Sequence, residues 1–252
     1  MANLEEAWTC LSLSEHEGEV FNFENQVCRK EYTLAVKFFM KLALNIEVVA
    51  CTLKPLWRTK QDFEIQDMGN HILLFVFENE LDANQVLLGE PWSFDKYLVV
   101  LCTYEDDSFL RRLRFDTAKF WVQVHGLPVS CMVMETAESL CKSMGRVIHS
   151  NDRFEIECGD FMRIRVEVDV HKPLCKRRRV CFCPNRKDWM LFRYEQLPIF
   201  CHWCGVLNHD SKECDLWLQS KGELRTESQE YGSWLRADTT SLLRKRWFGY
   251  VV

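Results

Sequence analysis

The chain has 252 residues, of which 47% are hydrophobic and 27% charged, and its formal net charge is −5 at pH 7. This composition is ordinary for a soluble protein, and the lack of an apolar run of about 18 residues excludes a transmembrane helix. The first residues, MANLEEAWTC, lack the basic and apolar regions of a secretory signal peptide. We therefore expect a protein of the nucleus or cytoplasm, with most of its 13 cysteines reduced.

The charge is unevenly distributed along the chain. Residues 1–110 contain 8 Lys and Arg against 19 Asp and Glu, whereas residues 111–214 contain 18 against 13. The middle third can therefore attract an anionic partner locally, although the whole chain is acidic.

Residues 1–30 are acidic and weakly patterned, which predicts a loosely attached lead-in. Residues 31–110 alternate between the period of strands and the period of helices. Asn45 is a predicted N-cap, FEIQDMGNHILLFVF predicts two strands around a Met-Gly-Asn turn, and Gly89 ends a second predicted helix. The resulting β-α-β-β-α-β order is that of a ferredoxin-like (RRM-like) domain.

One predicted strand of this domain, HILLFVF, has apolar residues on both faces. RNA-recognition domains place base-stacking aromatics on such a strand, but here the preceding basic residue is missing and the surroundings are acidic. We expect one face of this strand to pack against the following unit; it carries His71, Leu73, Phe75 and Phe77. We expect the other face, with Ile72, Leu74 and Val76, to lie against the helices.

Residues 111–198 predict a smaller, β-rich second unit. The strand FWVQVHGLP is followed by a helix, METAESLCKSMG, which Gly145 closes. Four further strands are predicted from RVIHS, FMRIRVEVDV, RRVCFC and WMLFRYEQLP. With a short cysteine-rich segment at 199–216 and a tail at 217–252, the overall class is α+β.

The cysteine-rich segment has the spacing C-x2-C-x4-H-x4-C, formed by Cys201, Cys204, His209 and Cys214. Thiolates and imidazole are the ligands of closed, tetrahedral zinc sites with a structural role. Gly205 lets the backbone turn after the second cysteine, and Asn208 tolerates a left-handed conformation before the histidine. A redox pair is the alternative for Cys201 and Cys204, but it leaves the other two residues unexplained. We expect a bound Zn²⁺.

Two groups of residues near this segment are candidate contacts for nucleic acid. Trp203 lies between the ligands and is expected either to stack on an unpaired base or to cover a hydrophobic neighbour. The run KPLCKRRRV can contact phosphates, and its alternative role is that of a solvated edge strand. The candidate basic residues are Lys176, Arg177, Arg178 and Arg179.

The remaining chemistry-bearing residues suggest no second site. Cys175, Cys181 and Cys183 lack a further ligand at metal-binding spacing, so we expect them to be core thiols. The sequence has no GxSxG, P-loop or HExxH signature and no Tyr-x-Asp-Asp pair, so we expect no enzyme.

The cluster resembles the CCHC zinc knuckle of retroviral and retrotransposon nucleocapsid proteins. Together with FWVQVHGLP, RIRVEVDVHKPL, YEQLPIFCHWC and YGSWLRA, it resembles plant proteins related to LINE-type, non-LTR retrotransposons. Those proteins carry an N-terminal plant domain of unknown function, which GEPWSFDKYLVVL also fits, followed by this knuckle. Their usual Gly-His is Asn208-His209 here.

The resemblance implies zinc and nucleic-acid binding in a Gag-like role. We expect weak, salt-sensitive binding of single-stranded RNA or DNA, because one knuckle offers few contacts. The alternative is a module for protein–protein interaction or self-association, in which the knuckle is purely structural. No membrane and no small-molecule substrate is expected.

Overall fold

The computed structural model describes residues 32–104, 113–149, 157–158, 160–183 and 186–238. The chain divides into two units, Met1–Glu31 and Tyr32–Val252, and all described residues belong to the second. The acidic lead-in predicted for residues 1–30 lies outside the described residues. No helix in the described part is long and apolar enough to cross a membrane.

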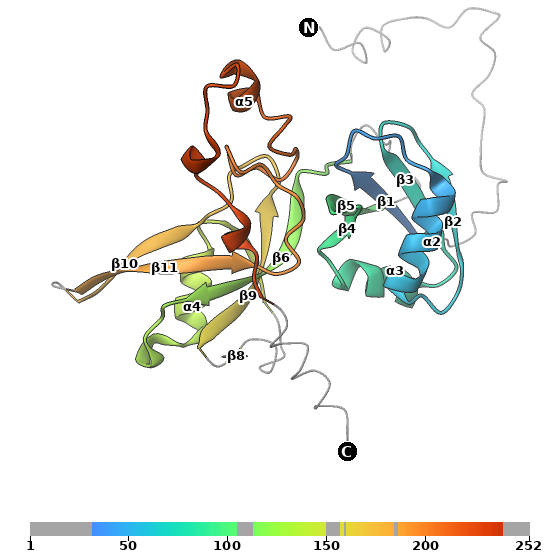
Figure 1. Cartoon of the computed structure of the whole chain (residues 1–252). Helices are drawn as coiled ribbons and strands as arrows, with labels where there is room; N and C mark the ends of the chain where they lie inside the picture. The colour runs from blue at the N-terminus through green and yellow to red at the C-terminus, as the bar shows by residue number, and fades with distance from the viewer. Residues whose placement is uncertain (1–31, 105–112, 150–156, 159, 184–185, 239–252) are drawn as a thin grey trace, which may run out of the picture. The chain divides into compact units, whose positions relative to one another are not determined.

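The first sheet is antiparallel and has five strands, and two helices connect strands of this sheet (Figure 1). Its strands are in the order β2-β3-β1-β5-β4. The helices and strands predicted for this region are all present and follow one another in the predicted order. The short strand β4 was not predicted. The elements are β1 (Tyr32–Phe38), α2 (Ile46–Trp57), β2 (Phe63–Asp67), β3 (Ile72–Phe77), α3 (Glu80–Leu88), β4 (Trp92–Phe94) and β5 (Tyr97–Tyr104).

The predicted cap and turn of this region are confirmed. The Asn45 side chain accepts hydrogen bonds from the backbone N–H groups of Glu47 and Val48, so it satisfies two donors at the start of α2. Gly69 and Asn70 have positive φ angles of 75° and 52°, as a tight connection between β2 and β3 requires.

The predicted orientation of β3 is wrong. Leu73, Phe75 and Phe77 are at most 1% exposed and pack in one cluster with Trp57 of α2. The ring centroids of Trp57 and Phe75 are 4.8 Å apart. This face therefore turns toward the helices, because the large rings fill the space beneath the apolar side of α2. A period-two pattern that is apolar on both faces does not reveal which face a helix covers.

The second sheet has the order β10-β11-β6-β9-β7, and the two-residue strand β8 pairs with β9. Gly145 opens β7 rather than closing the preceding helix, and a Cβ atom there would lie 2.0 Å from the carbonyl oxygen of Glu167. The elements are β6 (Thr117–His125), α4 (Met134–Cys141), β7 (Gly145–Ile148), β8 (Glu157–Cys158), β9 (Phe161–Asp169), β10 (Arg177–Cys183) and β11 (Arg186–Tyr194).

One face of this sheet is a hydrophobic core to which α4 contributes Ala137 and Leu140. Because side chains alternate along a strand, the other face carries the intervening, mostly polar residues. The core positions of the three central strands include Phe120, Val122, Val124, Ile164, Val166, Met190, Phe192 and Tyr194.

The segment after the knuckle also packs on this sheet. It contains α5 (Asp215–Gln219) and two short 3₁₀ turns, η4 (Thr226–Ser228) and η5 (Ser233–Leu235). Leu235 is fully buried, and the Ala237 N–H donates to the Tyr194 carbonyl at 2.8 Å. Residues up to Ala237 are therefore held against the edge of β11, although the sequence predicts only a tail.

Candidate metal centre and nucleic-acid interface

The four predicted zinc ligands converge on one point. One ligand atom from each of Cys201, Cys204, His209 and Cys214 lies within 4.8 Å of all the others. Zinc–sulfur and zinc–nitrogen bonds of about 2.3 and 2.0 Å place tetrahedral ligand atoms about 3.5–3.8 Å apart. The Sγ atom of Cys204 and the Nε2 atom of His209 are 3.3 Å apart, close to that spacing. The site is thus positioned to bind a zinc ion.

A tight turn brings the first two cysteines together. Gly205 has a φ of +76°, as the sequence predicts, and its N–H donates to the Cys201 carbonyl at 2.8 Å. The backbone N–H of Cys204 points at the Sγ atom of Cys201, 3.5 Å away. A Cβ atom on Gly205 would lie 2.3 Å from the ring of Tyr231, so the glycine also gives room to the segment after the knuckle.

The electrostatics of the site favour a bound cation. Burial raises the pKa of the Cys201 thiol and of the Cys204 thiol. Only the thiolate forms are good metal ligands, and burying them without a positive charge is costly. A zinc ion would supply that charge, so metal binding and folding of this segment are coupled.

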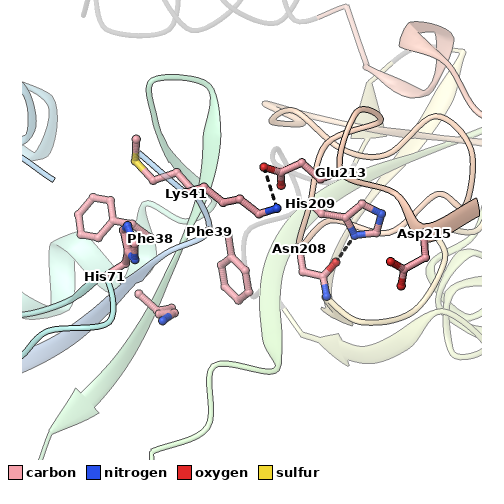
Figure 2. A pocket seen from close by; sticks show the side chains of 10 residues that line it. Phe38, Phe39, Lys41, His71, Asn208, His209, Glu213 and Asp215 are labelled. Atoms are coloured by element: carbon pink, nitrogen blue, oxygen red, sulfur yellow. Dashed lines mark hydrogen bonds and ion pairs between the residues drawn. The ribbon is translucent and has the colours of Figure 1, made fainter. Parts of the chain in front are cut away.

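Asn208 contributes through its side chain and not through a left-handed backbone, since its φ is not positive. Its Oδ1 atom lies 2.6 Å from Nδ1 of His209 (Figure 2). An amide oxygen can only accept, so Nδ1 carries the proton and Nε2 presents its lone pair toward Cys204. The amide nitrogen of Asn208 donates in turn to Nδ1 of His171 at 2.9 Å, and Nε2 of His171 lies 3.4 Å from Asp116.

Trp203 packs inside the knuckle. It is 9% exposed, and its ring stacks on that of Trp217, with centroids 5.3 Å apart and an angle of 9° between the planes. This is the geometry of the alternative in which Trp203 covers a hydrophobic neighbour. A base could take this ring face only by displacing Trp217, and the stacking role of Trp203 stays a prediction.

The four predicted basic contacts form two pairs with different surroundings. Lys176 is bound to Glu230 at 2.9 Å and lies over the ring of Tyr231. Arg178 donates to the Leu140 carbonyl and to Ser143 at the end of α4. Lys176 therefore contacts the segment after the knuckle. Arg178 lies on the core side of β10, opposite Met190, and contacts the end of α4.

Arg177 and Arg179, in contrast, project from the other face of β10 and are exposed. Both guanidinium groups lie over the ring of Trp189 on β11, at 4.5 and 5.9 Å from its centroid. Trp189 is not among the site residues predicted from the sequence. The feature of the sequence that could have revealed it is the period of two in WMLFRY, because this period places Trp189, Leu191 and Arg193 on one strand face.

The expectation of core thiols is wrong for Cys181, which is exposed, and Cys175 is half-buried. Cys181 pairs with Lys187 across the hairpin, on the polar face of the sheet. Alternation along β10 decides this placement, and the composition of the segment does not reveal it. The described residues around these cysteines include no second group of ligands close enough to hold a metal.

Comparison with known proteins identifies two regions. Residues 168–216 match the model of the zinc knuckle family, and residues 28–109 match that of a domain of unknown function, DUF4283. The chain is 24% identical over 138 residues to an uncharacterised protein of Arabidopsis thaliana; the aligned region is 53% of this chain and 42% of that relative. The match therefore spans less than half of the relative's length. No solved structure matches the chain significantly.

Proposed function

We propose that this protein binds single-stranded nucleic acid, RNA or DNA, in a zinc-dependent manner and in a Gag-like role. The observation that carries the proposal is the closed four-residue ligand set on a β-rich unit with exposed arginines. Zinc knuckles are modules of single-strand recognition, and arginines supply the salt-sensitive affinity for phosphates. The protein is proposed to act by binding, without catalysis, in the nucleus or cytoplasm.

The order of the regions supports the Gag-like part of the proposal. A DUF4283 region precedes a zinc knuckle, as in the LINE-type plant proteins that the sequence resembles. The strand order of the first sheet also supports the ferredoxin-like plan expected for residues 31–110.

The test uses the purified full chain, a fluorescent oligouridine RNA and its oligothymidine counterpart. We expect about one zinc per chain, and binding that a chelator abolishes and added zinc restores. Cys204→Ser should lose both zinc and RNA binding, whereas Cys51→Ser, which changes an exposed cysteine of α2 away from the site, should retain both. Protein without zinc would contradict the proposal.

A second candidate function is a protein–protein interaction or self-association module with a purely structural knuckle. Hydrogen bonds around the turn at Gly205 favour a structural role of the knuckle. The Leu174 N–H donates to the Gly205 carbonyl at 2.9 Å, and the Tyr231 N–H donates to the His202 carbonyl at 3.1 Å. The knuckle thereby joins the sheet to the segment that follows. One zinc per chain without RNA binding, together with a zinc-dependent change in oligomeric mass, would favour this function.

A further inference from the structure

The outer face of the β10–β11 hairpin is a continuous basic and aromatic surface. The register pairs Arg177 with Leu191 and Arg179 with Trp189. Directly opposed residues share a face, and every second residue of each strand joins them. The surface, called the outer hairpin face below, consists of Arg177, Arg179, Cys181, Lys187, Trp189, Leu191 and Arg193.

This face is open to solvent. Trp189 is 45% exposed and Leu191 is 44% exposed, and the four cationic residues are exposed as well. On the opposite face, Met190 and Phe192 are at most 1% exposed and belong to the core. The tryptophan and leucine therefore lie outside this core and present apolar surface to solvent.

The charge of the outer hairpin face is not balanced by nearby carboxylates. Within the described part of the chain, no Asp or Glu forms an ion pair with its three arginines or with Lys187. Asp188, the acidic residue of β11, pairs with Val180 on the other face. Four positive charges are thus directed at solvent over a short stretch of backbone, which complements a polyanion.

The shape of the hairpin suits a flexible strand. β6 pairs with β11 only from Leu191 to Tyr194, so Trp189 and Arg179 lie on a two-stranded arm beyond it (Figure 1). Cations on alternate residues are about 6.8 Å apart along a strand. Arg179 lies opposite the tryptophan on β10 and Arg177 lies opposite Leu191, while Lys187 precedes the tryptophan by two residues on β11. A ligand with repeated negative charges and flat apolar groups can contact both kinds of side chain.

We propose that the outer hairpin face is the surface on which a single-stranded nucleic acid lies, with Trp189 stacking on an unpaired base. This inference rests on the proposed function and moves its stacking residue from Trp203 to Trp189. Arg177 and Arg179 contact the flanking phosphates, and their place over the ring lets the base, the tryptophan and a guanidinium form one stack. Duplexes bind less well, because their bases have no free face.

The test measures binding of a fluorescent 12-nucleotide oligouridine to the zinc-loaded full chain by anisotropy, at two salt concentrations. Trp189→Ala should weaken binding about 10-fold, within the range of one lost base stack, and Trp189→Phe should retain most of the affinity. The matched control is Trp234→Ala, because Trp234 is 52% exposed and lies outside the hairpin; its binding should equal that of the wild type.

A second pair of variants tests the phosphate contacts. Arg177→Gln with Arg179→Gln should reduce the slope of log affinity against log salt by about 1.4, which corresponds to two phosphates on a single strand. Arg114→Gln with Arg146→Gln removes the same charge from exposed positions elsewhere, at 86% and 75% side-chain exposure, and should leave the slope unchanged.

The outcomes separate this inference from the proposed function. Zinc-dependent RNA binding that Trp189→Ala and the arginine pair leave unchanged would overturn the hairpin surface and keep the function. Absence of RNA binding by the wild type would overturn both. Binding of the wild type to phosphatidylserine vesicles, lost in the same variants while RNA binding persists, would also overturn the inference, since the surface would then be a membrane contact.

Discussion

Asn208 precedes the histidine ligand and joins two imidazole rings through one amide group. Its oxygen accepts from His209 and its nitrogen donates to His171, at 2.6 and 2.9 Å. The zinc knuckles that this segment resembles usually have glycine at this position, and glycine could not make either contact. The amide fixes the tautomer of the ligand, as carboxylates and carbonyls do around many zinc-bound histidines.

Asn208→Gly should therefore lower zinc affinity by about 10- to 100-fold, the usual cost of losing such a partner, while the stoichiometry stays at one zinc. Competition with a chromophoric chelator measures the affinity. His171→Ala, which leaves the direct partner of His209 in place, should have a smaller effect. Unchanged affinity in Asn208→Gly would show that the ring needs no support.

At the scale of elements, Asp82 joins the start of α3 to the connection after α2. It is 2% exposed, and its carboxylate accepts from the backbone N–H groups of Lys60 and Gln61, each at 3.1 Å. Asn79 caps the same helix and donates to this carboxylate at 2.9 Å. The sequence showed neither contact, because Asp82 and Lys60 are 22 positions apart.

The charge of Asp82 should stabilise the first sheet in a pH-dependent way. Burial alone would raise its pKa, but the hydrogen bonds from Gln61, Lys60 and Asn79 lower it below its usual value. A lowered pKa means that this stability is complete above the unfolded value of about 3.9 and is lost as the pH falls through the folded value.

We expect Asp82→Asn to lower the free energy of unfolding at pH 7 by about 1–3 kcal/mol and to weaken the acid sensitivity. Urea unfolding at pH 7 and pH 3 measures both effects. Asp62→Asn is the control, since the Asp62 side chain is 79% exposed. A variant as stable as the wild type at pH 7 would contradict the role of the carboxylate.

At the scale of the whole molecule, the knuckle connects chain segments that are distant in sequence. It is bonded to the second sheet through Gly205 and Leu207, whose partners are Leu174 and Val170, and to the following segment through Tyr231. The loop has only a small apolar cluster of its own around Cys201, Trp203 and Cys214. We therefore expect its order to depend on a bound metal as well as on these neighbours.

Removal of zinc should raise amide hydrogen exchange across residues 199–237. The amides of β1 and β3, which pair within the first sheet, should keep their protection because no ligand lies there. Hydrogen exchange monitored by mass spectrometry, with and without chelator, measures the protection of residues 199–237 and of the first sheet in one experiment. Unaltered exchange in residues 199–237 would mean that the segment folds without the ion.

Predictions from sequence succeeded where the determining contacts are local. Asn45, the turn at Gly69 and the glycine of the metal turn act within a few residues, so their types report their roles. Predictions of faces were less secure: Leu73 and Phe75 face the helices, and Cys181 faces solvent. β3 and β10 each carry apolar residues on both faces. The element that covers one of these faces comes from a distant part of the chain, so the local pattern does not show which face is buried.

The sequence by itself determined the zinc ligands, because Cys201 and Cys214 lie within fourteen residues and one loop can place all four donors. It also determined the order of strands and helices, which follows from local periodicity. Only the tertiary structure decided which basic and aromatic residues are available to a ligand. Arg178 is directed at α4 and Trp203 is covered by Trp217, while Arg177 stays exposed beside Trp189. Exposure depends on the neighbours that folding brings from distant segments, and no local pattern records them.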